Sequence, residues 1–152
     1  MPAPHPEYVT RLKQLVKEAP YPSHMNMELT EVDLDRAVVE LSLGEYHMQP
    51  FGIVHGGVLA TLIDTATFWA AFLRLPEDTG LVNIDLKLNY LRPVEKGHLR
   101  ADGKCLRHGR SISYAESGVV DQSGELVAHG TSTLMALPGK GLQVGVEKFL
   151  SE

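Results

Sequence analysis

Apolar residues recur along this chain with two different periods, and the period separates helices from strands. Between Pro6 and Glu18 the spacing is helical and predicts a short amphipathic helix, with Tyr8, Val9, Leu12, Leu15 and Val16 on its apolar face. From about Gly56 to Leu75 the chain is apolar on nearly every side, and between Val58 and Leu75 only Asp64 and Arg74 are charged. A helix of that kind is buried all round.

Alternation of apolar and polar residues marks the strands. The clearest runs over residues 82–90, and an earlier one covers about 37–43. Three more strand-like segments follow at residues 98–106, 111–120 and 126–137, separated by turn residues at 108–109 and 121–124. The tail after Pro138 has three glycines and a weak pattern, so we expect it to be frayed or peripheral.

The order is therefore one strand, one long helix, and then several antiparallel strands. An antiparallel sheet with one apolar face must bury that face, and only the helix at 56–75 is long and apolar enough to cover it. This predicts an α+β fold in which an antiparallel sheet wraps around one long central helix. We expect a domain over residues 22–138, an N-terminal helix and linker over 1–21, and a C-terminal tail over 139–152.

Composition narrows the function. The chain has 152 residues, which suits one domain, and its net charge of −5 argues against nucleic acid or an anionic membrane as the main partner. Cys105 is the only cysteine, so no internal disulfide forms and a reducing compartment, the cytoplasm, is expected. The N-terminus lacks a signal segment, and Asp64 interrupts the longest apolar stretch. The histidines are scattered, so we expect no metal and no cofactor.

Asp64 is the conspicuous residue of the predicted central helix. A carboxylate in a buried apolar helix is costly unless it is hydrogen-bonded, paired or protonated. One interpretation is structural: the carboxylate accepts from Thr61 or Thr67, or pairs with a distant basic residue. The other is functional: a base or nucleophile held in a partly dry cleft. Chemistry alone leaves both open.

The segment QPFGIVHGG at residues 49–57 runs straight into this helix. Two glycines at a helix N-terminus let a ligand approach backbone N–H groups that carry the positive end of the helix dipole. Such a terminus holds a phosphate or a developing oxyanion. The alternative is that Gly56 and Gly57 allow tight packing and that His55 is structural. No nucleophile motif is present, and nothing near Cys105 in the sequence activates it.

Taken together, QPFGIVHGG, LIDTA at residues 62–66 and IDLKLNYLRP at 84–93 resemble the hotdog-fold thioesterases of the phenylacetate-pathway (PaaI-like) branch. The resemblance covers roughly residues 22–137 and implies a hotdog fold and hydrolysis of an acyl-CoA thioester. It implies that Asp64 acts as general base or nucleophile and that the Gly56 N–H polarises the thioester carbonyl. His55 and Gln49 match polar residues around that carbonyl. Asn83 stands where Ser or Thr often orients the water.

The same resemblance implies a coenzyme A thioester with its nucleotide on the protein surface. Arg92, Arg107 and Arg110 are then phosphate contacts, unless they are simply solvated charges. Gly57 and Phe68 complete the expected substrate-binding residues. The acyl group stays open between an aromatic and a medium-chain fatty group. Four aromatic residues are available to line a slot for it: Phe51, Phe68, Trp69 and Phe72.

Two other functions remain. Hydratases and dehydratases share the hotdog fold but place a His and an acidic residue differently. A non-catalytic acyl-CoA sensor is the second alternative, although such proteins usually add a DNA-binding module, for which the N-terminal segment is too short.

Helix geometry predicts how the site is assembled. Asp64 lies nine residues after His55, which corresponds to about 13 Å along a helix axis and to opposite faces. A carbonyl held at Gly56 therefore does not meet Asp64 of the same chain. If both belong to one site, two chains share it, in a homodimer or a pair of dimers whose helices run antiparallel across a two-fold axis.

Overall fold

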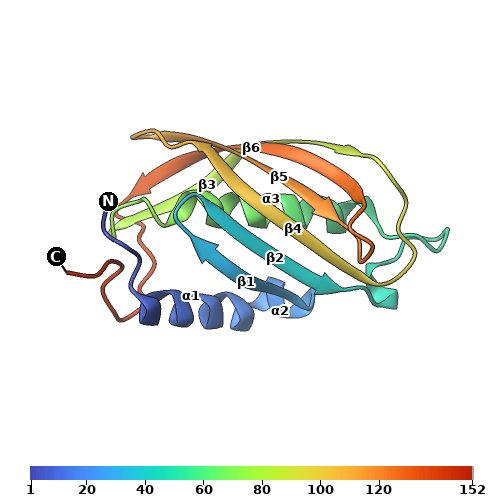
Figure 1. Cartoon of the computed structure of the whole chain (residues 1–152), viewed down its shortest axis with the longest axis horizontal. Helices are drawn as coiled ribbons and strands as arrows, with labels where there is room; N and C mark the ends of the chain where they lie inside the picture. The colour runs from blue at the N-terminus through green and yellow to red at the C-terminus, as the bar shows by residue number, and fades with distance from the viewer. Residues whose placement is uncertain (152) are drawn as a thin grey trace.

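In the computed structural model, which describes residues 1–151, an antiparallel sheet curves around one central helix (Figure 1). The helices are α1 (Pro6–Glu18), α2 (Pro20–His24), the 3-10 turn η1 (Glu45–His47) and α3 (Gly56–Phe72). The strands are β1 (Met27–Asp33), β2 (Arg36–Ser42), β3 (Thr79–Tyr90), β4 (His98–Arg107), β5 (Ile112–Val120) and β6 (Leu126–Pro138). Among residues 1–151, no helix is both long and apolar enough to cross a membrane.

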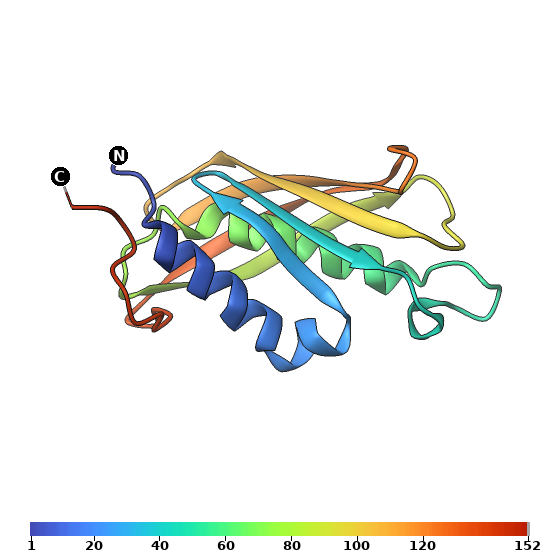
Figure 2. The same cartoon turned by 60° about the horizontal axis from the view of Figure 1, so that its bottom comes forward.

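The six strands form one sheet in the order β1-β2-β4-β5-β6-β3, and every neighbouring pair is antiparallel. The strand that follows α3 therefore returns to the far edge, beside the last strand. Figure 2 shows α1 alongside β1, at the opposite edge of the sheet. The predicted α+β fold, an antiparallel sheet wrapped around one long helix, is confirmed.

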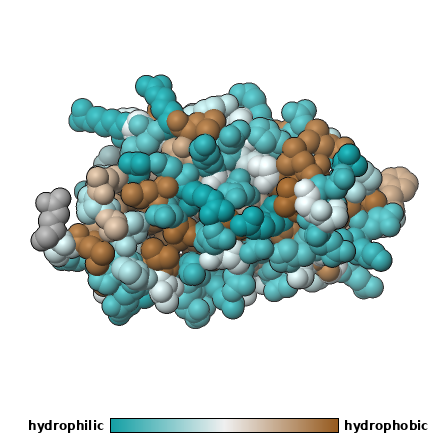
Figure 3. All heavy atoms as spheres, viewed as in Figure 1, coloured by the Kyte–Doolittle hydropathy of each residue, from teal (hydrophilic) through white to brown (hydrophobic). Residues whose placement is uncertain are grey.

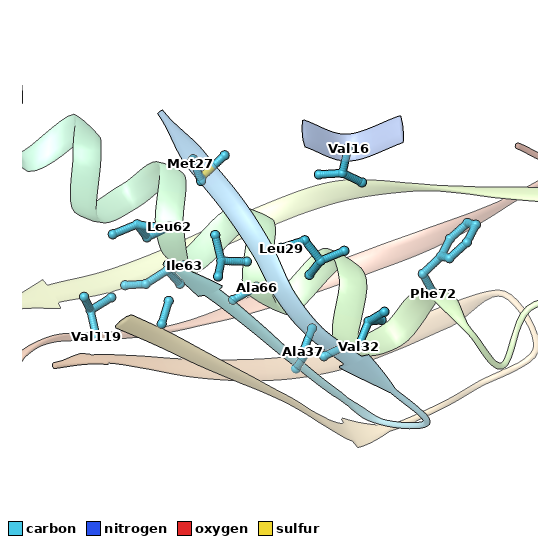
Figure 4. Close-up of a cluster of buried hydrophobic side chains, with 14 of the residues drawn as sticks. Val16, Met27, Leu29, Val32, Ala37, Leu62, Ile63, Ala66, Phe72 and Val119 are labelled. Carbon is cyan, nitrogen blue, oxygen red and sulfur yellow. The ribbon is translucent and has the colours of Figure 1, made fainter. Parts of the chain in front are cut away.

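The core lies between α3 and the concave face of the sheet. Helix α3 contacts all six strands, because its apolar side chains point in almost every direction. Leu62, Ile63 and Ala66 of α3 lie in one buried cluster with Leu29 of β1 and Val119 of β5 (Figure 4). Each fully buried Leu or Ile contributes about 1.5–3 kcal/mol relative to an exposed one, so α3 is the main hydrophobic anchor of the fold.

The outer surface is more polar. Arg36 of β2 pairs with Glu31 of β1 at 2.6 Å and with Asp102 of β4 at 2.9 Å. Arg100 of β4 also reaches Glu31, at 3.2 Å. Figure 3 accordingly shows a mostly hydrophilic face in which the apolar patches are separate.

Helix α1 has the predicted bounds. His5 caps its N-terminus, where the ring Nδ1 accepts from the Glu7 N–H at 3.1 Å, and Pro20 follows its last turn. Its buried residues Tyr8, Leu12 and Val16 come from the predicted apolar stripe.

Strand β1 was not expected from the sequence pattern. Its buried residues are Met27, Leu29 and Val32, which do not keep the two-residue period of a strand. The pairing with β2 shifts register between Leu29 and Glu31. A bulge at this point moves the following residues to the other face, so the alternation that would reveal the strand is broken.

A second bulge corrects our interpretation of β3. The strand is present, but its alternating apolar residues do not share one face, because the register with β6 shifts between Asn83 and Asp85. Leu86 and Leu88 pack against the core, whereas Ile84 is 52% exposed. The bulge turns Asn83 toward α3, where its Nδ2 lies 3.4 Å from the Asp64 carbonyl oxygen.

The central helix ends at Phe72, three residues earlier than expected, and the C-terminal tail closes that end. Lys148, only 1% exposed, donates from Nζ to the carbonyl oxygens of Leu75 at 2.8 Å and Phe72 at 3.3 Å. Burial lowers the pKa of Lys148 to about 8. A cation beside the last carbonyls of a helix opposes the negative end of its dipole.

Of the two expectations for the tail, frayed or peripheral, the structure favours the second. Its backbone joins the N-terminus through hydrogen bonds from His5 N–H to the Lys148 carbonyl (2.8 Å) and from Leu150 N–H to the Ala3 carbonyl (3.1 Å). The sequence pattern is weak because Lys148 and Val144, rather than a regular apolar period, hold this segment against the domain.

Helix α3 and the sheet pack closely at Gly103 of β4. A Cβ atom there would lie 2.3 Å from the Ala66 carbonyl oxygen. We expect Gly103→Ala to lower the free energy of unfolding by about 1–3 kcal/mol in urea denaturation, because backbone rather than a flexible side chain must move. The neighbouring exposed Lys104→Ala is the control and should stay within about 0.5 kcal/mol of wild type. Equal stability of the two variants would contradict this close packing.

Candidate active site

The N-terminus of α3 presents one free backbone donor. His55 is the cap residue, and its Nδ1 accepts from the Gly57 N–H at 2.8 Å, while the Val58 N–H donates to the His55 carbonyl at 2.9 Å. The N–H of Gly56 donates to no protein group within residues 1–151. The first N–H groups of a helix lack intrahelical acceptors. Gly56 is thus the free donor here, and the N–H of Gly57 is already used.

Tyr90 lies directly against Gly56 and was not among the predicted site residues. A Cβ at Gly56 would be 2.9 Å from the Tyr90 Oη, and this hydroxyl donates to the Gly56 carbonyl at 3.2 Å. Only glycine fits without displacing the ring. The only sequence signal for Tyr90 is its place in the IDLKLNYLRP segment. Its contact with Gly56 could not be predicted from the sequence, because β3 and the start of α3 come together only in the folded chain.

A pocket of about 430 Å³ opens beside this helix start. It brings together Gln49, Gly56 and Arg92 with Tyr90. The Gln49 Oε1 accepts from the Phe51 N–H, and Arg92 pairs with Glu125 at 2.8 Å. Three of the predicted site residues, from two segments of the sequence, therefore line one space.

Asp64 lines a different pocket, of about 260 Å³, where α1, α2 and α3 meet. Its neighbours there are mainly apolar: Leu15, Val16, Ala19, Tyr21, Pro22, Met27, Thr65, Phe68, Trp69 and Leu142. The carboxylate is half-buried, and burial raises the pKa of Asp64 above its ordinary value. Among the residues described, no basic group forms an ion pair with it.

The structural interpretation of Asp64 predicts contacts that residues 1–151 do not make. The Thr67 hydroxyl donates to the backbone carbonyls of Ile63 (2.8 Å) and Asp64 (3.0 Å) rather than to the carboxylate. The Thr61 hydroxyl lies 2.7 Å from the Tyr21 hydroxyl. Asn83 likewise contacts the Asp64 carbonyl and, at 3.4 Å, the Ser132 hydroxyl. Asn83 therefore contacts the backbone of α3 at Asp64 and does not bind the carboxylate.

The other predicted substrate-binding residues are dispersed in the single chain. Phe68 and Trp69 share the pocket of Asp64, whereas Phe51 is 91% exposed and Phe72 is buried beside Lys148. Arg107 ends β4 and Arg110 lies in the β4–β5 turn, at the end of the sheet where β3 begins. Gly56 lies at the other end, near Tyr90. Within residues 1–151 no three His, Cys, Asp or Glu side chains form a metal-binding group.

Known proteins match this chain in sequence and in fold. The family model of the thioesterase superfamily matches residues 51–128. The chain belongs to the thioesterase superfamily. Proofreading thioesterase EntH of Klebsiella pneumoniae is 29% identical over 102 residues, 67% of this chain and 74% of that protein. 1,4-Dihydroxy-2-naphthoyl-CoA hydrolase of Listeria monocytogenes is 26% identical over 110 residues, 72% and 89% of the two chains.

A solved structure of a Haemophilus influenzae thioesterase superposes with a TM-score of 0.79 at 28% identity. The match covers 86% of this chain and 90% of that one. The hotdog fold and the enzyme class, a thioester hydrolase, are thereby confirmed at the level of the thioesterase superfamily. The matched range contains both Gly56 and Asp64 but not α1, α2 or the tail.

The raised pKa of Asp64 predicts how stability depends on pH. Folding strengthens proton binding here, so the contribution of Asp64 to stability falls as pH rises from the ordinary aspartate pKa of 3.8 through the raised value, and is then constant. Replacing Asp64 with Asn removes this loss. We expect the Tm of Asp64→Asn to exceed that of wild type at neutral pH and the difference to vanish below about pH 4. A lower Tm for the variant at neutral pH would mean that a partner stabilises the carboxylate.

Proposed function

We propose that this protein hydrolyses acyl-CoA thioesters to a free acid and coenzyme A. The observation that carries the proposal is the half-buried carboxylate of Asp64 in an apolar pocket of a thioesterase-superfamily chain. The name of the Listeria relative, a CoA hydrolase, supports a coenzyme A thioester. Because a thioester is already activated, a base, a water and one or two oxyanion donors suffice.

Asp64 acts on water or on the thioester itself. As a general base, it takes a proton from water while the water oxygen attacks the carbonyl carbon. As a nucleophile, its carboxylate oxygen attacks that carbon and forms an anhydride, which water then hydrolyses. In both routes the carbon–sulfur bond breaks and the thiolate of coenzyme A takes up a proton. Burial supports either role, because a desolvated carboxylate is more basic.

The Gly56 N–H stabilises the oxyanion that forms on the carbonyl oxygen. It is unpaired within residues 1–151 and lies at the positive end of the α3 dipole. Gln49 lines the same pocket, and His55 fixes the helix start by accepting from Gly57. Arg92 lines the same pocket, and we propose that it contacts a phosphate of the coenzyme.

We infer that each active site is shared between two chains. Gly56 and Asp64 line different pockets of one chain and are eight residues, about 12 Å, apart along a rigid helix. In a homodimer, or a pair of dimers, antiparallel α3 helices related by a two-fold axis bring Gly56 of one chain to Asp64 of the next. The cytoplasm remains the proposed location.

Asp64→Asn should lower kcat by at least about a hundredfold, the scale of a positioned acid–base group. The amide is nearly isosteric, so the protein should fold. The assay is thiol release from a panel of acyl-CoAs, and Asp85→Asn, an exposed carboxylate on β3, is the matched control. A folded Asp64→Asn protein with near wild-type turnover would remove Asp64 from the mechanism. Stoichiometric binding without turnover by wild type would favour a sensor.

The shared site predicts complementation between inactive chains. Asp64→Ala chains and Gln49→Ala/His55→Ala chains are unfolded and refolded together. Random pairing makes about half of the dimers mixed, each with one intact site, so about a quarter of wild-type activity should return. Mixed dimers are verified by mass. If they form and no activity returns while both parents are inactive, the site is not shared.

A further inference from the structure

The pocket beside Asp64 has a wall made by the N-terminal helices. Leu15 and Ala19, from α1 and its C-terminal cap, and Tyr21 of α2 line it together with Phe68 and Trp69 of α3. The hydroxyl of Tyr21 is hydrogen-bonded to that of Thr61, so apart from Asp64 and Thr65 the lining offers hydrocarbon contacts. Such a space suits an apolar group attached to a carbonyl at Asp64.

The two sides of this pocket come from different parts of the chain. Asp64, Phe68 and Trp69 lie inside the range that matches the thioesterase superfamily, whereas the wall residues precede residue 51. The family model thus spans the reactive side of the pocket but not the opposite wall. A change in that wall would alter the shape of the pocket without replacing Asp64.

The wall is held in a fixed position. Leu12 and Val16 anchor α1 in the core, and the 2.7 Å hydrogen bond between Tyr21 and Thr61 ties α2 to α3 one turn before Asp64. In contrast, the side chain of Leu15 is 40% exposed, so it limits the pocket without supporting the core.

We propose that α1 and α2 limit the size of the acyl group, with Leu15, Ala19 and Tyr21 as specificity-determining residues. The proposal rests on the thioesterase chemistry proposed at Asp64. The pocket has a volume of about 260 Å³ and a mainly apolar lining. The preferred substrates are therefore thioesters of medium-chain fatty acids or single-ring aromatic acids, and long-chain acyl groups react more slowly.

The test measures kcat/KM for straight-chain acyl-CoAs of about two to sixteen carbons and for phenylacetyl-CoA. For wild type, each added methylene should raise kcat/KM about fourfold up to roughly eight carbons, after which it falls. Leu15→Ala should move the optimum to longer chains and Ala19→Leu to shorter ones. Gln14→Ala, on the exposed face of α1, is the control and should leave the profile unchanged. General destabilisation would not shift the optimum in opposite directions.

A second readout does not depend on turnover. Trp69, the only tryptophan of the chain, lines the pocket, so its fluorescence reports occupancy. Octanoate and phenylacetate added to the Asp64→Asn protein should change Trp69 emission, whereas acetate should not. Leu15→Ala and Ala19→Leu, each added to Asp64→Asn, should change the fitted affinity for octanoate.

The outcomes separate the two proposals. If wild type hydrolyses no acyl-CoA but Trp69 responds to octanoate, the proposed chemistry fails and the assigned pocket stands. If turnover is normal but all four proteins share one chain-length optimum, or octanoate leaves Trp69 emission unchanged, the assigned pocket is wrong and the chemistry stands.

Discussion

Burial of most of α3 is the constraint on which the rest of this structure depends; the face that carries Asp64 and Phe68 is only half-buried in the single chain, which corrects the expectation of a helix buried all round. Its side chains are apolar in nearly all directions, so each face needs an apolar neighbour. The curved sheet covers most of the helix, and Gly103 lets β4 approach its backbone closely. The N-terminal helices flank the remaining side at the Asp64 pocket, and Lys148 closes the C-terminal end. A polar residue on such a helix stands out because its surroundings are costly for a charge.

The same constraint shapes the proposed chemistry. Helix α3 keeps its N-terminus and Asp64 about two turns apart, so the proposed oxyanion donor and the proposed base line separate pockets of one chain. Burial raises the pKa of Asp64, whereas the rise of the helix is what keeps that carboxylate away from Gly56 of the same chain. Association of two antiparallel helices is the arrangement that reconciles a buried base with a free helix N-terminus.

Periodicity was enough to predict the long helix, α1, β2 and the later strands, and the unusual placement of Asp64 was evident from its apolar neighbours. What the sequence pattern missed has local physical causes. Bulges in β1 and β3 break the two-residue period, so β1 was overlooked and Ile84 was assigned to the wrong face. Tyr90 meets Gly56 only through the fold. The tail is held by Lys148 and Val144, and the wall of the Asp64 pocket comes from residues distant in sequence; neither arrangement leaves a periodic signal.

The central claim is that one thioester is held between Gly56 of one chain and Asp64 of another. The most direct measurement is a crystal structure of the protein with an acyl-CoA analogue in which a methylene replaces the thioester sulfur, giving a ketone that hydrolysis cannot cleave. The account predicts that the ketone oxygen lies about 2.7–3.1 Å from the Gly56 nitrogen of one chain. Asp64 of the partner subunit should lie against the carbonyl carbon. A ketone bound with Gly56 and Asp64 of the same chain, or in contact with neither, would contradict it.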